Sequence, residues 1–340
     1  ARPTAAVVQG LEAPRGFAPF RRAVFGRDDR ILAIGDAGGG ITLYEIDWRI
    51  GPSQLRKVQR LDGPHSSMAF SPDGKTLAAG TPDGKVLLVD LATQATTTML
   101  RTAHPGLVGE LIYSADGMNL AGMVAQSGFT VWDARTRAVR SRIDFAEQPG
   151  AAHLAFTAQG ELLAISRGYR VRCWDAVSGQ ERKLTFPTLP RVEQPGKPLA
   201  RTGSVAALTR DGDMVIVCND GTVYLWRRAA NHVQHVFTLP TPLTEGLIFL
   251  ASPRGDTVAW CAQESNRIAI WDVGLKRELA VVHRPFEGGI TCRAYSSDGQ
   301  RFFWSGLPEA PKPGVTAMPT VGGVIDLDVR RSEIARTLRP

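Results

Sequence analysis

One short turn recurs along the chain at a nearly constant spacing, and this repetition limits the possible folds more than any other feature. Residues 69–90, AFSPDGKTLAAGTPDGKVLLVD, hold two Asp-Gly turns, and turns related to the first lie at 112–117, 155–160, 207–212, 251–255 and 294–299, with a weaker copy at 24–29. An Asp-Gly turn between alternating apolar and polar residues is typical of a β-hairpin, because glycine adopts positive φ without steric cost. The chain is therefore predicted to be a series of antiparallel meanders.

The spacing of the turns defines a repeat. The steps between successive turn glycines are 43, 43, 52, 43 and 44 residues, for Gly74, Gly117, Gly160, Gly212, Gly255 and Gly299. About 15 residues past each turn a strand ends in a bulky residue that is usually followed by an acid. These pairs are Tyr44-Glu45, Val89-Asp90, Trp132-Asp133, Trp174-Asp175, Trp226-Arg227, Trp271-Asp272 and Leu327-Asp328. Seven units are present.

With turn and Trp-Asp pairs recurring in phase over residues 17–340, the chain resembles the WD-repeat β-propeller family, whose units of about 40–45 residues each form one four-stranded blade. The resemblance implies an all-β fold, a seven-bladed β-propeller of four-stranded antiparallel blades, as a single domain over 1–340. The expected blades are 17–61, 62–103, 104–149, 150–186, 204–240, 243–285 and 288–340. The segment AAVVQGLE at 5–12 is the expected closing strand, with residues 5–11 paired to the seventh blade as its fourth or fifth strand.

The chain departs from the family in its histidines. In the family, a His near the start of each unit bonds through a Ser or Thr and an Asp to the Trp of that unit. Here only His104 has that spacing, ahead of Trp132, and the Ser/Thr position of its unit is Gly122. Asp83 and Asp220 keep the acidic hairpin position without a matching His. We therefore expect apolar packing to hold the blades together. The predicted structural residues are His104, Trp132, Trp174, Trp226 and Trp271.

The sequence contains none of the common catalytic motifs. HExxH, GxSxG and Walker sequences are absent, and the six histidines are scattered. GDAGGG at 35–40 has the glycine content of a phosphate loop, but a strand follows it rather than a helix N-terminus, so a hairpin loop is predicted. Paired acids such as Asp28-Asp29 fall in the recurring turns. We therefore predict no enzymatic activity, no catalytic residue, no cofactor and no metal site.

Cysteine usage and hydropathy bear on the environment of the protein. Cys173, Cys218, Cys261 and Cys292 lie in different units, and no CxxC occurs. Neighbouring blades pack about 10 Å apart, too far for a disulfide, so buried free thiols are predicted. Free thiols favour a reducing compartment such as the cytoplasm. No apolar run approaches the roughly 20 residues that span a bilayer, so a soluble domain is expected.

Basic residues raise the question of nucleic-acid binding. The formal net charge is +7, with 33 Arg against 7 Lys, and basic residues cluster at 21–27, 135–142 and 329–339. In the middle cluster Arg140 and Arg142 alternate with Ser141 and Ile143, the pattern of an outer strand with one wet face. A solvated blade edge, whose charges discourage edge-to-edge association, explains this cluster without a nucleic acid.

Three functions remain open at this point. The first is a non-enzymatic protein–protein interaction scaffold, expected as a domain of a larger protein, with another protein or another domain of the same chain as its partner. The second is a propeller enzyme or small-ligand binder with its site at the central channel. The third is a basic nucleic-acid-binding surface, whose binding would depend steeply on salt. The fold resemblance favours the first.

Two insertions predict where a partner docks. Residues 187–203 lie between an outer strand and the next innermost strand, and residues 307–323 lie between the second and third strands of the last unit. In a meander these two connections emerge on the same side of the disc, which is the face that this family usually uses for partners. The alternative is that a rigid scaffold simply tolerates long loops there. The candidate partner-binding residues are Arg191, Val192, Glu193, Lys197, Leu199, Arg201, Glu309, Lys312, Val315 and Met318.

Overall fold

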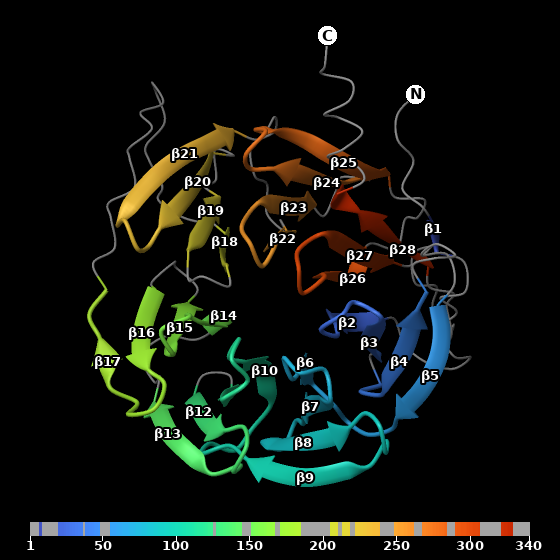
Figure 1. The fold of residues 1–340 in the computed structure, drawn as a ribbon, viewed down its shortest axis with the longest axis vertical. Coiled ribbons are helices and arrows are strands. Elements are labelled where there is room, and N and C mark those ends of the chain that lie inside the picture. The colour runs from blue at the N-terminus through green and yellow to red at the C-terminus, as the bar shows by residue number, and fades with distance from the viewer. Residues whose placement is uncertain are drawn as a thin grey trace, which may run out of the picture.

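Seven four-stranded antiparallel sheets form a ring around a central channel (Figure 1). The computed structural model describes residues 7–8, 20–36, 38–47, 55–124, 127–144, 151–166, 171–184, 205–209, 213–217, 222–238, 248–261, 267–283, 290–306 and 321–328. In six blades the strands follow chain order from the channel outward, as β-meanders do. The predicted seven-bladed β-propeller is confirmed.

The first four blades lie between residues 20 and 182. Blade one holds β2 (Phe20–Phe25), β3 (Ile31–Asp36), β4 (Ile41–Ile46) and β5 (Leu55–Leu61). Blade two holds β6 (Ser67–Phe70), β7 (Thr76–Gly80), β8 (Lys85–Asp90) and β9 (Thr96–Arg101). Blade three holds β10 (Val108–Tyr113), β11 (Asn119–Val124), β12 (Gly128–Asp133) and β13 (Val139–Asp144). Blade four holds β14 (Ala151–Phe156), β15 (Glu161–Ser166), β16 (Val171–Asp175) and β17 (Glu181–Arg182).

The remaining three blades complete the ring. Blade five holds β18 (Val205–Leu208), β19 (Met214–Val217), β20 (Thr222–Arg227) and β21 (His232–Thr238). Blade six holds β22 (Ile248–Ala251), β23 (Thr257–Cys261), β24 (Arg267–Asp272) and β25 (Arg277–His283). Blade seven holds β26 (Ile290–Tyr295), β27 (Arg301–Gly306) and β28 (Val321–Asp326), with β1 (Val7–Val8) as its outermost strand.

The recurring turn joins the first two strands of a blade by the same local bonds each time. In blade two, Gly74 has φ +73°, its N–H donates to Ser71 O at 2.9 Å, and the Asp73 carboxylate accepts from Lys75 N at 3.0 Å. In blade three, Gly117 has φ +72° and its N–H likewise donates to Ser114 O at 2.9 Å. The hydrogen bonds of each turn are formed by residues of the same turn. The same residue types therefore recur wherever this turn occurs.

The bulky residue near the end of each third strand packs against the blade before it. Trp132 is buried with residues of β7 and β8, and Trp174 packs against Phe129 of β12 with ring centroids 5.5 Å apart. Trp271 of β24 stacks on Phe237 of β21 at 4.8 Å. The same relation holds for Tyr44, Val89, Trp226 and Leu327. These side chains therefore form the apolar interfaces between blades.

The ring closes at the junction of blade seven and blade one. β1 pairs antiparallel with β28 through Val7 and Gly323 and through Val8 and Gly322, where the sequence places a closing strand. The other residues of the predicted closing segment lie outside the described ones. On the opposite edge of the junction, the almost fully buried Asp29 accepts from Ser297 N at 3.1 Å and from Arg301 Nη1 at 3.1 Å. Chain ends far apart in sequence are thus joined by both backbone and side-chain bonds.

Some boundaries differ from those expected. β28 begins at Val321, so residues 321–323 of the second expected insertion are strand, and this strand ends at Asp326, one residue before Leu327. β17 covers only Glu181–Arg182 of the expected outer strand. Cys173 is buried and free, whereas the side chains of the other three cysteines lie outside the description. Within the described residues, no helix is long and apolar enough to cross a membrane.

Candidate functional site

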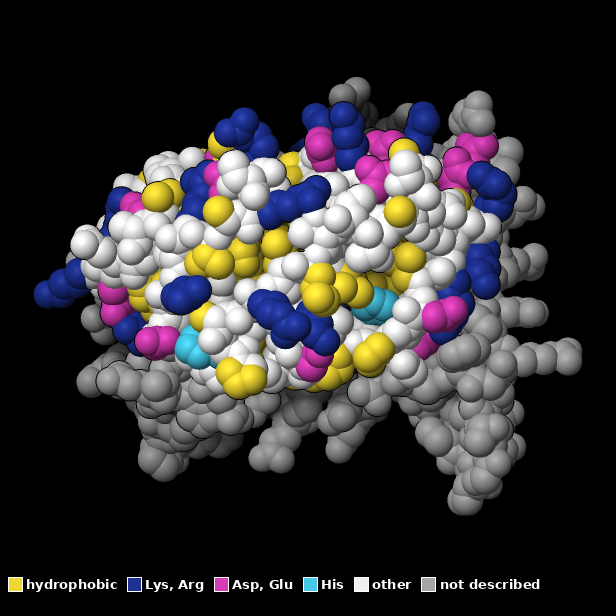
Figure 2. Space-filling model, turned by 90° about the horizontal axis from the view of Figure 1, so that it is seen from below, with side chains coloured by type: hydrophobic (Ala, Val, Ile, Leu, Met, Phe, Trp, Pro, Cys, Tyr) yellow, Lys and Arg dark blue, Asp and Glu magenta, His cyan; other side chains and the backbone are white. Residues whose placement is uncertain are grey.

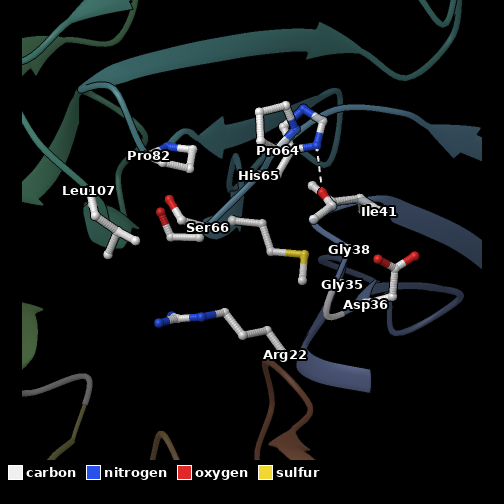
Figure 3. Close-up of a pocket in the computed structure, with 13 residues that line it drawn as sticks. Arg22, Gly35, Asp36, Gly38, Ile41, Pro64, His65, Ser66, Pro82 and Leu107 are labelled. Carbon is white, nitrogen blue, oxygen red and sulfur yellow. Dashed lines mark hydrogen bonds between the residues drawn. The ribbon is translucent and has the colours of Figure 1, made fainter. Parts of the chain in front are cut away.

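A cavity of about 530 Å³ opens at the channel mouth between blades one and two (Figure 3). It lies among connections from second to third strands and from one blade to the next, at residues 35–41, 64–68, 82 and 107. Its lining residues are Arg22, Gly35, Asp36, Gly38, Gly39, Ile41, Pro64, His65, Ser66, Ser67, Met68, Pro82 and Leu107. This volume is within the range of about 300–1,000 Å³ typical of ligand sites.

One wall of the cavity consists of two loops that hydrogen-bond to each other. His65 N donates to Gly39 O at 2.9 Å, and its ring Nδ1 lies 2.9 Å from the same oxygen. Because a carbonyl oxygen only accepts, Nδ1 carries the proton in this contact. Gly39 has φ +88°, and a Cβ there would lie 2.8 Å from the Cα of Pro64. Only glycine fits this approach, so the GDAGGG segment is a tightly packed hairpin loop between β3 and β4.

The carboxylate in this wall is already neutralised. Asp36 is almost fully buried, its Oδ1 accepts from Gly40 N at 3.0 Å, and its Oδ2 lies 2.9 Å from Arg60 Nη1. Arg60 is also largely buried and pairs with Asp62 at 2.8 Å. The buried Asp36–Arg60 pair stabilises the loop, and the charge of Asp36 is therefore not available to a ligand.

Arg22 lines the cavity, and its positive charge is available to a ligand. Its side chain is exposed, and within the described part of the chain it forms no hydrogen bond and no ion pair. Figure 3 shows Arg22 across the cavity from Pro64 and His65, with its guanidinium end on the side where Leu107 lies. Leu107 is 47% exposed, and Met68 packs its methyl group toward Gly35. The site thus combines one free positive charge with apolar walls.

Glu110, on the innermost strand of blade three, is a carboxylate that interacts electrostatically with Arg22. It is half-buried on β10, and its Oε2 accepts from Leu154 N of β14 at 3.0 Å, which ties blade three to blade four. Burial raises the pKa of Glu110 to about 8, against the opposing effects of Arg22 and of the Leu154 N–H. At neutral pH this carboxyl is therefore mostly protonated and does not cancel the charge of Arg22.

The raised pKa of Glu110 predicts a pH-dependent stability. The folded protein keeps this proton up to about pH 8, whereas the unfolded chain releases it near the ordinary Glu pKa of about 4.3, so the stabilisation is present at low pH and is lost as the pH rises through 8. We expect Glu110→Gln to exceed the wild type in unfolding free energy by about 1–2 kcal/mol above pH 8, and to match it at about pH 5. Urea denaturation at the two pH values measures this.

Glu45→Gln is the matched control, because it removes one negative charge from an exposed position on β4. An equal pH-dependent gain in both variants would show that overall charge, rather than Glu110, is responsible.

All ten predicted partner-binding residues lie outside the described residues, so their role stays a prediction. The residues of the cavity were not predicted. GDAGGG drew attention by its glycines alone, and nothing in the sequence marks Arg22, Met68 or Leu107 as neighbours. Among the described residues, no three His, Cys, Asp or Glu side chains lie close enough to hold a metal ion.

His104 and Trp132 lack the Ser or Thr that links the two residue types in the family, because that position is Gly122. His104 Nε2 lies 3.1 Å from Asp144 Oδ1, and a Cβ at Gly128 would come within 2.8 Å of that nitrogen. At Gly122 a Cβ would lie 3.0 and 3.1 Å from atoms of the Trp132 ring. The indole thus occupies the space in which a serine or threonine hydroxyl would stand, and packing replaces the network.

Charges on the rim of the disc are mixed in sign. Figure 2 shows basic and acidic side chains interspersed on the side seen from below Figure 1. Arg140 of β13 pairs with Asp133, Arg56 of β5 with Glu45, and Arg172 of β16 with Glu181. Ser141 and Ile143 are buried while Arg142 is exposed, as the sequence indicates for an outer strand. The Arg140–Asp133 pair neutralises one arginine of the middle basic cluster, and the three pairs together fit the blade-edge interpretation.

The fold and this site define a β-propeller with a pocket at its channel mouth. The family model of the outer membrane protein assembly factor BamB matches residues 73–236, from the turn before β7 into β21, just under half of the chain. The target of rapamycin complex subunit wat1 of Schizosaccharomyces pombe is 31% identical over 175 residues, 51% of this chain and 52% of that protein.

An uncharacterized WD repeat-containing protein of the same yeast is 25% identical over 111 residues, 33% of this chain and 19% of that protein. The matches thus span about half the length of the first relative and about a fifth of the second. Together with the seven-bladed ring, these relatives confirm the resemblance to the WD-repeat β-propellers.

Proposed function

We propose that this chain is a non-enzymatic interaction scaffold whose channel-mouth face docks a protein, either a separate partner or another domain of a longer chain. The observation that carries the proposal is the cavity on that face, which combines apolar walls with Arg22, a side chain that forms no hydrogen bond or ion pair within the described residues. Protein–protein contacts rely on such buried apolar anchors accompanied by arginine. One relative is named as a subunit of a protein complex, which supports an interaction role for this fold.

The two insertions extend the same face. By topology they belong to the connections β17–β18 and β27–β28, which emerge on the side of the cavity. They hold eight of the 22 prolines of the chain, namely Pro187, Pro190, Pro195, Pro198, Pro308, Pro311, Pro313 and Pro319. Proline restricts the unbound loop and so reduces the entropy lost on docking. We therefore include both insertions in the proposed interface.

Shortening each insertion to the length of a regular connection tests this proposal. We expect the shortened chain to lose about tenfold or more of its affinity for partners, since each loop contributes ordered contacts. Partner capture is compared by proximity labelling in cells and by affinity of the purified proteins. Val177→Ser, an exposed change in the β16–β17 turn on the opposite face, is the control. Full capture by both shortened variants, with melting temperatures unchanged, would refute the role of the insertions.

A further inference from the structure

The proposed interface contains one position whose chemistry can be specified further, and this inference rests on the proposed function. We propose that the cavity between blades one and two holds an acidic residue of a peptide segment of the partner, with its carboxylate on Arg22 and an adjoining apolar side chain against Met68 and Leu107. No relative's name assigns such a site.

Charge complementarity selects the acidic group. Arg22 is the cation of the cavity without a hydrogen-bonded carboxylate in the described chain, whereas the buried Asp36 is held by Arg60. Glu110 of β10 interacts electrostatically with Arg22 but forms no ion pair within the described residues, and its Oε2 accepts from Leu154 N at 3.0 Å. A guanidinium in a partly enclosed site donates two parallel N–H bonds to a carboxylate, which makes Arg22 a specific binding site for Asp or Glu.

The apolar walls of the cavity favour an apolar residue next to the acidic residue of the peptide. Ile41, Pro64, Pro82 and Leu107 line the cavity together with the thioether of Met68, a side chain that adapts its shape to different partners. Ser67 also lines the cavity, but its hydroxyl packs against Gly80. The polar contact available to a ligand side chain therefore comes mainly from Arg22, and the remaining contact is apolar.

The cavity is already formed before a ligand binds. The loops at Asp36–Gly40 and Gly63–His65 are joined by the two contacts between His65 and Gly39 O, and the Asp36–Arg60 pair holds the first loop to β5. A preformed wall loses little entropy on binding, so a short segment gains measurable affinity from one charged contact and one apolar contact. This size and shape fit a peptide anchor better than a flat nucleic-acid surface.

Selection of displayed random peptides on the purified wild-type chain, followed by binding of every recovered peptide to wild type and to Arg22→Met, tests the proposal. We expect the recovered peptides to share an Asp or Glu beside a Leu, Ile, Met or Phe. Affinities of the recovered peptides follow from fluorescence anisotropy, with Asp or Glu replaced by Asn or Gln in matched peptides. Loss of the charge-assisted contact, in either the peptide or Arg22→Met, should weaken binding about 10- to 100-fold. Leu107→Ala should weaken it several-fold.

Arg101→Met is the matched control, since Arg101 is an exposed arginine on β9 at the rim. It should leave peptide affinity unchanged. Recovered peptides without an acidic residue, or peptides that bind Arg22→Met as tightly as wild type, would overturn the acidic anchor while leaving the scaffold function intact. Tighter Arg22-dependent binding of inorganic phosphate or of a single-stranded oligonucleotide than of any peptide would assign the cavity to that ligand instead. The insertion variants test the scaffold function, and their partner capture is measured separately from the peptide binding that tests the acidic anchor.

Discussion

Phe303→Ala should lower the free energy of unfolding by about 3–5 kcal/mol, as expected for removing a fully buried phenylalanine. Phe303 of β27 is wholly inaccessible to solvent and packs with Phe25, Ile34 and Tyr44 of blade one. Truncation leaves a cavity at the junction where the last blade meets the first. Because every blade of a closed ring is held on both sides, a cavity at this junction weakens the closure of the whole ring.

The measurement is the urea midpoint of the purified variant, together with the affinity of the chain for its partner. Met118→Ala serves as the control, since Met118 is 45% exposed in the β10–β11 turn and its removal should change stability by less than about 0.5 kcal/mol. If both variants unfold at the same urea concentration, the apolar junction between blades one and seven contributes nothing to closure.

Gly122→Ser should destabilise the protein by about 1–3 kcal/mol, although it introduces the residue type that the family carries at this position. A side chain on Gly122 would meet the Trp132 ring at 3.0–3.1 Å and Leu111 Cδ2 at 3.2 Å. Trp132 is almost fully buried and has no room to move away. The added hydroxyl would also be buried without a hydrogen-bond partner, which lowers the stability further.

Gly109→Ser on β10 is the matched control, because a Cβ there meets its nearest neighbours at 3.6 and 3.8 Å, an ordinary contact distance. Thermal melting of the two variants separates steric overlap from the general effect of replacing glycine in a strand. A higher melting temperature for Gly122→Ser would mean that the introduced hydroxyl completes a hydrogen-bond network with His104, contrary to the packing observed.

The fold was largely predictable because a propeller blade is specified by local chemistry. Each Ser-x-Asp-Gly turn is stabilised by hydrogen bonds among its own residues, as at Ser71 and Ser114. The turn can therefore be predicted from its sequence alone. The bulky residue at the end of each third strand is equally visible. What the pattern did not reveal is the partner of that residue. Trp132 packs against blade two instead of joining a hydrogen-bond network within its own blade.

The sequence by itself determined the number of blades, the order of their strands and the turns between them, because these depend on residues within one repeat. The tertiary structure alone decided the candidate site. Arg22, Met68 and Leu107 occupy successive repeats, and they line one cavity only because closure of the ring places blades one, two and three around the same channel mouth. Whether Arg22 was paired could likewise not be predicted. Asp36 lies on the neighbouring strand, but its carboxylate is bound to Arg60, which leaves Arg22 with its charge open to a ligand.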